Sequence, residues 1–495
     1  MTPSQLTKRQ QIRNILIYML PVGINHLLPF ITIPIFTRIF NPEDYGILAL
    51  SMIYGIFMSG LANLGMTLAF ERNFFLYKES SEKLAQLFYS SLVFVTINFS
   101  ILAGLTYSFR VIISEFITGS PNHGGLIMTI FFAQFFSNII NNFFFIYLKN
   151  YEKAKINSKY KIINTIMNFV LSLFFVAFLK IGIIGIAFAQ LISGVLIFIF
   201  FLYLFLQELP FSLNKSILLE SLRISYPLFP RIFIGVINTQ FDKYMISLLA
   251  TVGGVGLYHI GKKISESVFN FITIIENVFN PQIYQRMFEQ HEQGSESIGR
   301  YLTPFLYISI FVALCVGLFS EEIMTVLAPV SYHGAIPVIT ILVMYFGFLF
   351  FGKITSIQVL YSKKTHIISI MSFFSVGLNV CLNIPMIMKF GIIGAAGATS
   401  LSGIISSSLG IIIAQHLYKI HWEWKKIAWI MGTFLIGATV IAFMNLLDIP
   451  YFWSLIIKII FLAFYLNLGI YYKIITKENY REIGSIFRPL KTVTT

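Results

Sequence analysis

The sequence predicts an all-α membrane protein with about fourteen transmembrane helices. Three observations lead to this prediction: 57% of the 495 residues are hydrophobic, only 11% are charged, and the mean hydropathy is +0.79. Charged residues make up about a quarter of a typical soluble domain, so this chain has too little polar surface for one. Apolar stretches of roughly 20 residues, the length a helix needs to cross the hydrocarbon layer, recur along it. The short alternating segments of a membrane β-barrel are not found in the sequence.

A window of about 19 residues gives the predicted spans. They cover residues 15–37, 46–68, 86–109, 125–148, 162–179, 183–206, 224–250, 254–280, 302–320, 335–361, 366–388, 392–417, 427–447 and 452–472. Charged residues interrupt the seventh, eighth and tenth of these segments.

The lysines and arginines of the loops indicate the orientation of the chain. With the N-terminus in the cytoplasm, the inner segments carry 25 of the 35 Lys and Arg residues, and the outer ones carry only Arg38, Arg110, Lys180 and Lys389. Because cytoplasmic loops are rich in Lys and Arg, both termini are predicted to lie inside. The net charge of +14 then reflects topology and attraction to anionic lipids, so nucleic acid is not an expected partner.

A short motif occurs twice. K-x-G-I-I-G stands at residues 180–185 and at 389–394, a separation of 389 − 180 = 209 residues. Gly46 and Gly256 are separated by nearly the same distance, 256 − 46 = 210 residues. A shared offset indicates an internal repeat.

This repeat predicts the domain organisation. A shift of six spans preserves the orientation of each helix, so the two copies are expected to be parallel bundles related by an axis along the membrane normal. The predicted lobes are residues 1–206 and 207–420, each of six helices. Residues 421–495 add two further helices and a cytoplasmic tail.

Polar residues inside apolar spans are the candidate site. A charge at the centre of a membrane helix costs roughly 2.5–3.5 kcal/mol, so these residues are expected to face a water-filled space. They lie in or at the ends of spans two, four, seven, eight and ten: Asn63 and Glu71; Asn138; Arg231, Asn238 and Asp242; Lys262, Glu266, Asn270 and Glu276; and Lys353. Cations outnumber carboxylates in the last three of these spans, which predicts an anionic cargo group. Structural pairing, as between Lys262 and Glu266 four residues apart, is the alternative.

Motifs of catalysis are not found in the sequence. It contains no P-loop, zinc-ligand spacing or nucleophile elbow. Its two cysteines, Cys315 and Cys381, lie inside apolar spans, and the acidic pair Glu321–Glu322 has no partner histidine. We therefore expect a transporter with no cofactor, no metal and no enzymatic activity. A membrane polysaccharide polymerase or glycosyltransferase, which needs a carboxylate or metal site facing its sugar donor, is the less favoured alternative.

Three segments carry a resemblance to a known family: PIFTRIFNPEDYGILAL at 34–50, DKYMISLLATVGGVGLYHIGKKI at 242–264 and KFGIIGAA at 389–396. They are similar to the Wzx-type polysaccharide repeat-unit flippases, which include the O-antigen flippases, of the multidrug/oligosaccharidyl-lipid/polysaccharide exporter superfamily. The resemblance implies two lobes around a V-shaped cavity in the inner membrane. It also implies a polyprenyl-pyrophosphate-linked oligosaccharide as cargo, for lipopolysaccharide or another surface polysaccharide.

With this cargo, the polar residues receive expected roles. Arg231, Lys262 and Lys353 would bind the pyrophosphate or an acidic sugar. Four asparagines would hydrogen-bond the sugar: Asn63, Asn138, Asn238 and Asn270. Four carboxylates would act as counter-charges or couple transport to an ion: Glu71, Asp242, Glu266 and Glu276.

The same resemblance sets the other expectations. The lobes would rock to give alternating access, and the protein would work as a monomer among membrane lipids, with polysaccharide polymerase or assembly proteins as partners. A cation-coupled multidrug exporter and a lipid II flippase, both of the same superfamily, are the alternatives. Fourteen spans also occur in the lipid II flippases, whereas many family members stop at twelve.

Overall fold

The computed structural model describes residues 8–364, 366–446 and 449–474, which form helices joined by short loops without any β-strand. The predicted all-α class is confirmed. Nine of the helices in these ranges are long and apolar enough to cross a membrane. Each predicted span lies almost entirely on helical residues, and the count of fourteen crossings stays a prediction.

The chain forms two compact units. Unit 1 takes the described residues up to His259 together with Leu327–Ser331, and unit 2 takes the others from Ile260 onward. The predicted lobes, 1–206 and 207–420, follow the sequence repeat rather than this division and stay a prediction.

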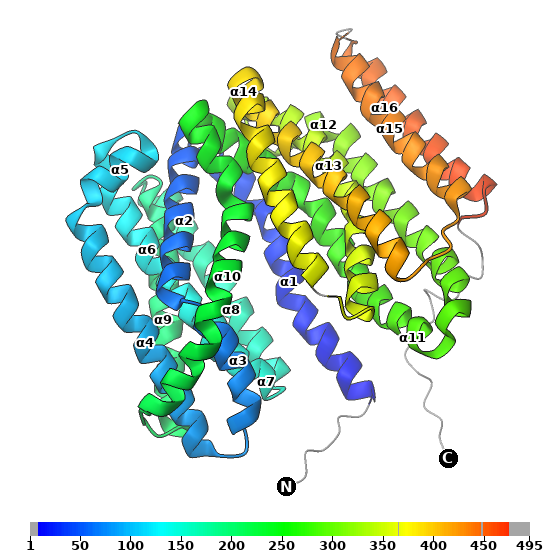
Figure 1. Ribbon diagram of the computed structural model, residues 1–495. Coiled ribbons are helices and arrows are strands. Elements are labelled where there is room, and N and C mark those ends of the chain that lie inside the picture. Colours follow the sequence, from blue (N-terminus) through cyan, green and yellow to red (C-terminus); the bar gives the residue numbers. More distant parts are fainter. Residues whose placement is uncertain (1–7, 365, 447–448, 475–495) are drawn as a thin grey trace. The chain divides into compact units, whose positions relative to one another are not determined.

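The helices are shown in Figure 1. Those of unit 1 are α1 (Lys8–Phe36), α2 (Pro42–Asn63), α3 (Met66–Tyr77), α4 (Ser81–Ser108), α5 (Arg110–Thr118), α6 (Gly124–Ile139), α7 (Phe145–Asn150), α8 (Ala154–Leu173), α9 (Ile184–Glu208) and α10 (Lys215–Leu249). A 3₁₀ turn η1 (Pro121–His123) and two π-helical turns, η2 (Ile140–Phe144) and η3 (Phe174–Phe178), join some of them. Helix α11 (Val252–Leu318) runs from unit 1 into unit 2, followed by α12 (Ser320–Leu327), η4 (Val330–Ala335), α13 (Ile336–Tyr361), α14 (His366–Leu417), α15 (Trp424–Leu446) and α16 (Tyr451–Tyr471).

Aromatic rings fill the interior of unit 1. Helix α2 packs against α4 and α6, and α6 packs against α9. Between α4 and α6 the rings of Phe99 and Phe135 stack with centroids 3.7 Å apart, and between α4 and α9 those of Phe88 and Phe205 stack at 5.0 Å. Lipid tails are as apolar as these side chains, so close ring packing rather than a hydrophobic driving force holds such helices together.

The second predicted span is interrupted in the structure. Residues 46–68 were expected to form one helix, but α2 ends at Asn63 and α3 begins at Met66. Leu64 and Gly65 between them have φ values of 46° and 77°, in the left-handed region. Glycine adopts this region without steric cost, and the Asn63 side chain accepts a hydrogen bond from the Thr67 backbone N–H at 3.1 Å, so the break is stabilised locally.

Helices α2 and α11 begin with similar caps. Asn41 accepts a hydrogen bond from the Asp44 N–H at 2.8 Å, and Asp44 accepts one from the Asn41 N–H at 3.2 Å, forming a capping box. Thr251, 251 − 41 = 210 residues later, accepts from the Gly254 N–H at 3.0 Å. Both side chains satisfy a donor that the first turn of a helix leaves without a partner.

These two helix starts cross at reciprocal glycines within unit 1. A Cβ atom on Gly46 would overlap the carbonyl oxygen of Val252, and one on Gly256 would overlap that of Pro42. The two contacts match at one offset, since 252 − 42 = 210 and 256 − 46 = 210. The backbones therefore meet at a distance that only glycine permits.

The two copies of K-x-G-I-I-G share a backbone feature. Gly182 before α9 and Gly391 inside α14 both have positive φ, at 74° and 58°. Gly391 kinks α14, which at 52 residues holds both the eleventh and the twelfth predicted spans. The repeated glycine thus places a similar bend before the sixth and the twelfth predicted spans.

A packing contact of the same kind occurs inside each unit. In unit 1 a Cβ on Gly194 would lie 3.1 Å from that of Phe136, and in unit 2 a Cβ on Gly403 would overlap the ring of Tyr345. The offsets agree, since 403 − 194 = 209 and 345 − 136 = 209. In each unit a glycine of one helix therefore receives an aromatic ring from its neighbour.

Helices α15 and α16 lie side by side in unit 2 (Figure 1), and α16 is fastened to α11 by two tyrosines. The Tyr307 hydroxyl donates to the Tyr465 carbonyl at 3.0 Å, the Tyr465 hydroxyl donates to the Tyr307 carbonyl at 2.9 Å, and the rings stack. Gly469 gives the Tyr307 ring its space.

Candidate functional site

Asparagine side chains from two helices of unit 1 meet inside the membrane-spanning region. Asn63 at the end of α2 donates to Asn138 of α6 at 3.0 Å and to Thr67 of α3 at 2.8 Å. Asn142 of η2 donates to the same Asn138 oxygen at 3.0 Å. We call these four residues the amide cluster. The sequence predicted that the polar residues of spans two and four face one space, and the structure brings Asn63 and Asn138 into contact.

The backbone around the amide cluster is irregular on both sides. The cluster lies beside the α2–α3 break, and Asn142 belongs to the π-helical turn η2. Single π turns in α-helices are frequent at functional sites. Amide groups both donate and accept hydrogen bonds, so this region suits a ligand rich in hydroxyl groups.

Substituting Asn138 by leucine is expected to reduce transport while leaving the protein folded. Asn63 and Asn142 would lose their shared acceptor, at a cost of about 0.5–2 kcal/mol for hydrogen bonds between membrane helices. Transport and the melting temperature of the detergent-purified protein would measure the two effects. Asn141→Leu is the matched control, because the exposed Asn141 side chain donates to Ser137, four residues earlier in the chain, and takes no part in the amide cluster. If Asn138→Leu transports at the wild-type rate, the amide cluster does not bind the cargo.

An ion pair joins two helices of unit 2. Lys353 of α13 lies with its Nζ 2.7 Å from a carboxylate oxygen of Glu276 on α11, and both side chains are largely buried. The Lys353 ammonium also stands 5.2 Å from the centre of the Phe269 ring. Glu276 thus acts as a counter-charge to Lys353, and the aromatic face adds a cation–π contact.

The other predicted residues of α11 follow one stripe. Lys262, Glu266 and Asn270 are spaced four residues apart and are each partly buried in unit 2. Residues at this spacing lie on one face of a helix, so the predicted stripe is present as a local feature.

Helix α10 carries the remaining predicted residues of unit 1. The side chains of Arg231 and Asn238 lie outside the described part of the structure, so their roles stay predictions. Asp242 is 2% exposed, and its carboxylate accepts a hydrogen bond from the Tyr258 hydroxyl at 3.0 Å. This bond joins α10 to the start of α11.

Glu71, a predicted counter-charge, lies in the middle of α3. Its carboxylate is 2.6 Å from Lys149 of α7, and both side chains are at least one-third exposed. A pair this exposed contributes little to stability.

The sequence did not identify Lys458, the most buried lysine among the described residues of unit 2. Lys458 of α16 is 3% exposed, and its Nζ donates to the two carboxylate oxygens of Glu322 at 2.8 and 3.0 Å. Glu321 lies 3.7 Å away. Lys458 is the single charge within the predicted span 452–472, which was a usable signal. Its partner stands 136 residues earlier, so spacing gave no hint of the pair.

Metal ligands were not expected. Within the described ranges, no three His, Cys, Asp or Glu side chains gather in a way that could hold a metal ion.

Comparison with known proteins relates these features to a family. A family model described as polysaccharide biosynthesis protein matches residues 12–287, more than half of the chain. The chain belongs to this family. It is 25% identical over 256 residues to a Haloferax volcanii protein described as a probable low-salt glycan biosynthesis flippase, Agl15. That match covers 50% of the chain, which spans about half (53%) of the relative's length.

Solved structures of transporters share the fold of this polysaccharide biosynthesis protein. The lipid II flippase MurJ in an inward closed conformation has a TM-score of 0.69 and 17% identity, covering 92% of this chain and 99% of MurJ. An inward-facing MATE family multidrug resistance transporter of the MOP superfamily has a TM-score of 0.58 and 16% identity, covering 81% and 97%. The family, the fold and the apolar helices make this chain a multi-pass membrane protein with the fold of these transporters.

Proposed function

We propose that this protein is a flippase that moves oligosaccharides linked to polyprenyl pyrophosphate across the inner membrane for surface polysaccharide synthesis. The observation that carries the proposal is the amide cluster, a set of uncharged hydrogen-bonding side chains between helices of a polysaccharide biosynthesis protein. Sugar hydroxyls would otherwise cross hydrocarbon without partners, at several kcal/mol each. The glycan-flippase relative supports the same cargo class.

The proposed mechanism is alternating access. One lobe rocks against the other while the head group stays in a hydrated, V-shaped cavity and the lipid tail stays in the bilayer. Arg231, Lys262 and Lys353 are the proposed ligands of the pyrophosphate. Asn238 and Asn270 extend the sugar contacts of the amide cluster, and Asp242, Glu266, Glu276 and Glu71 remain the proposed counter-charges or coupling groups. The protein acts by transport rather than catalysis and needs no cofactor.

Complementation tests the proposed function. A strain lacking its own flippase should regain surface polysaccharide when it expresses the wild type, regain less with Arg231→Lys, and regain none with Arg231→Ala, since only a guanidinium binds phosphate in a bidentate way. Immunoblots of the membrane fraction control for insertion. If Arg231→Ala exports surface polysaccharide normally, Arg231 has a structural role and does not bind the pyrophosphate. If the wild type does not restore surface polysaccharide but instead flips lipid II or exports drugs, the protein is a lipid II flippase or a multidrug exporter, respectively.

A charge exchange is expected to separate folding from transport at Lys353. Lys353→Glu and Glu276→Lys each place like charges together and should lower both the melting temperature and export. The double variant restores the ion pair with its charges reversed, so the melting temperature should recover. Export should stay low, because a ligand of pyrophosphate must be a cation at position 353. Full export by the double variant would limit this pair to a structural role.

A further inference from the structure

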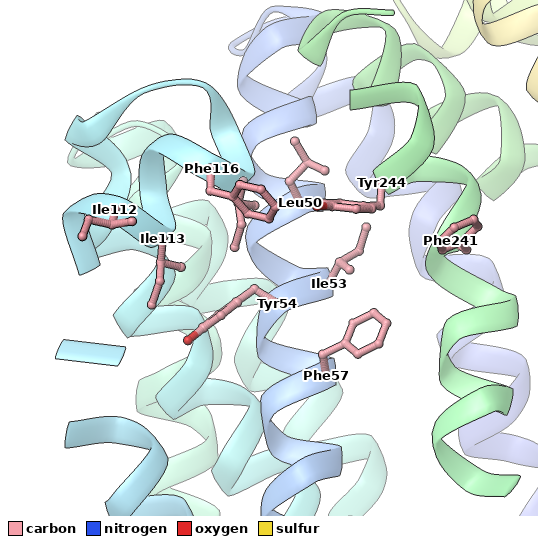
Figure 2. A pocket seen from close by; sticks show the side chains of 10 residues that line it. Leu50, Ile53, Tyr54, Phe57, Ile112, Ile113, Phe116, Phe241 and Tyr244 are labelled. Carbon is pink, nitrogen blue, oxygen red and sulfur yellow. The ribbon is translucent and has the colours of Figure 1, made fainter. Parts of the chain in front are cut away.

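The apolar cavity of unit 1 offers nothing to an anionic group. It has a volume of about 460 Å³, lies between α2, α5 and α10, and is lined by isoleucine and aromatic side chains such as Ile53, Phe57 and Phe116 (Figure 2). None of the described residues in its wall is charged. Two lysines of unit 1 stand instead beside the amide cluster, which begins at Asn63, the last residue of α2.

The ion pair of Lys149 and Glu71 continues the amide cluster by about one helical turn. Glu71 follows Thr67 by four residues on α3, and Lys149 of α7 follows Asn142 of η2 by seven. Residues at these spacings lie on one face of a helix. Because Thr67 and Asn142 both belong to the amide cluster, the contact of 2.6 Å between Lys149 and Glu71 lies directly beside it.

Lys161 of α8 reaches the same place from a neighbouring helix. Its ammonium group lies 5.1 Å from the centre of the Phe145 ring, and Phe145 precedes Lys149 by one turn on α7. Asn157, one turn before Lys161, donates to the Phe145 carbonyl at 3.0 Å, which holds this face of α8 against α7. The ammonium groups of Lys149 and Lys161 are near enough to repel each other. We call these two residues the lysine pair.

The lysine pair has more positive charge than its carboxylate partner neutralises. Glu71 pairs with Lys149, and both side chains are at least one-third exposed, so an anion can reach them. Lys161 is partly buried, yet it forms no ion pair with a carboxylate in the described ranges. A partly buried cation without a counter-charge lowers stability, so packing alone does not explain it.

Three buried polar atoms around the lysine pair also lack hydrogen bonds. They are Nδ2 of Asn150, Oδ1 of Asn157 and Oγ of Ser158, and none of them has a partner among the described residues. Asn150 follows Lys149 in the chain, and the other two lie one turn before Lys161. Each such atom costs stability, because it loses water without gaining a partner. Places where a fold gives up stability in this way are typical of functional sites.

We propose that the lysine pair binds the phosphate of a lipid-linked glycan while the amide cluster binds the sugar attached to that phosphate. Ammonium groups bind anions, and amide groups hydrogen-bond hydroxyls. The two adjoining sets of side chains therefore match a molecule that carries a phosphate next to a sugar. The loop charges predict that Lys149 and Lys161 lie toward the cytoplasm, so the site receives the head group before it crosses the membrane.

The proposal deepens the proposed function and rests on it, because that function supplies the lipid-linked source of the sugar phosphate. It adds the lysine pair to the residues proposed to bind the pyrophosphate.

Lysine acetylation of the full-length protein in phosphatidylcholine nanodiscs tests the site. A water-soluble acetylating reagent modifies accessible lysines, and mass spectrometry gives the rate at each one. The probe is N-acetylglucosamine linked to farnesyl pyrophosphate. It should slow acetylation of Lys149 and Lys161 about tenfold once its concentration is about ten times the Kd. Lys159, exposed on α8 with its ammonium group 5.8 Å from the Tyr160 ring, should react at an unchanged rate.

Substitutions at Lys161 separate binding from folding. Lys161→Gln should weaken protection of Lys149 by the probe about tenfold, as expected from the loss of one hydrogen bond to a charged group, and should lower export. Lys161→Arg keeps a cation and should retain most of both. The melting temperature of Lys161→Gln should not fall, because Lys161 has no ion pair to lose. A fall in the melting temperature together with export would make Lys161 structural and overturn the proposal. Lys159→Gln is the matched control and should change none of the three quantities.

Further probes separate the possible sources of phosphate. Farnesyl pyrophosphate without the sugar should protect Lys149 less well than the sugar-linked probe, and Asn138→Leu should abolish this difference. Equal protection by the two probes of the wild type would overturn the joint site. Equal acetylation of Lys149 with and without the sugar-linked probe also overturns the proposal.

Two other results would assign the lysine pair to a different ligand and overturn the proposal. Protection by phosphatidylglycerol in the nanodisc alone would make it a phospholipid site, and protection by UDP-N-acetylglucosamine at the same concentration would make it a site for a soluble sugar nucleotide. If the wild type restores export but the probe does not protect the lysine pair, only this inference fails. If the wild type restores no export, the proposed function fails.

Discussion

Gly256→Ala is expected to destabilise the protein and stop export, although alanine normally stabilises a helix. The added methyl group would overlap the Pro42 carbonyl where α2 and α11 cross. Overpacking a rigid contact costs about 1–3 kcal/mol or more, and here backbone rather than a flexible side chain would have to move. Gly46→Ala should act similarly, because its methyl group would overlap the Val252 carbonyl. Melting temperature and export by a complemented strain measure the effect.

Gly253→Ala is the matched control, one turn away on the same helix. Its Cβ would have no neighbour nearer than the Glu43 nitrogen at 3.9 Å, an ordinary contact. Without a clash, replacing glycine by alanine in a helix gains about 0.5–1 kcal/mol. The two variants should therefore shift the melting temperature in opposite directions. Equal shifts would mean that the helices cross with more space than the structure shows.

Lys458→Met is expected to cause the largest loss of stability in unit 2. Removing one partner of a buried ion pair costs about 3–5 kcal/mol, because the carboxylate of Glu322 stays behind without its counter-charge. Helix α16 should detach from α12 more readily, although the Tyr307–Tyr465 contact still joins it to α11. Unfolding in detergent, followed by tryptophan fluorescence, measures the change.

Combining Lys458→Met with Glu322→Leu should recover most of that stability, since an apolar pair of similar volume is often as stable as a buried ion pair. Lys153→Met serves as the comparison, because its partner Glu208 is about half exposed and the pair contributes under about 1 kcal/mol. A double variant no more stable than Lys458→Met alone would assign the loss to packing rather than to charge.

The positions of most helices could be predicted, because the hydropathy of a segment depends only on its own residues. Runs of apolar residues fix where helices form. The repeated motif predicted an internal repeat, and the positive φ values that its two copies share at Gly182 and Gly391 became visible only in the structure. The break at Leu64–Gly65 was not predicted, because the hydropathy of residues 46–68 is continuous across it. A helix break depends on backbone dihedral angles that hydropathy does not report.

The residue types of the candidate site could be predicted, but not which of these residues contact each other. Polar residues in apolar spans are conspicuous, which identified Asn63, Asn138, Lys353 and Glu276. Which of them meet depends on how each helix rotates about its axis and where it crosses its neighbours. Lys458 shows the same limit, since its partner could not be identified without the packing of α16.

The sequence by itself determined that this chain is a helical membrane protein with a motif that occurs twice and with polar groups in its apolar segments. Only the tertiary structure decided which side chains join, as in the amide cluster and the Lys458–Glu322 pair, and where α2, α5 and α10 leave a cavity. The physical reason is that composition and periodicity act within one helix, whereas hydrogen bonds, ion pairs and cavities arise between helices that are far apart in the chain.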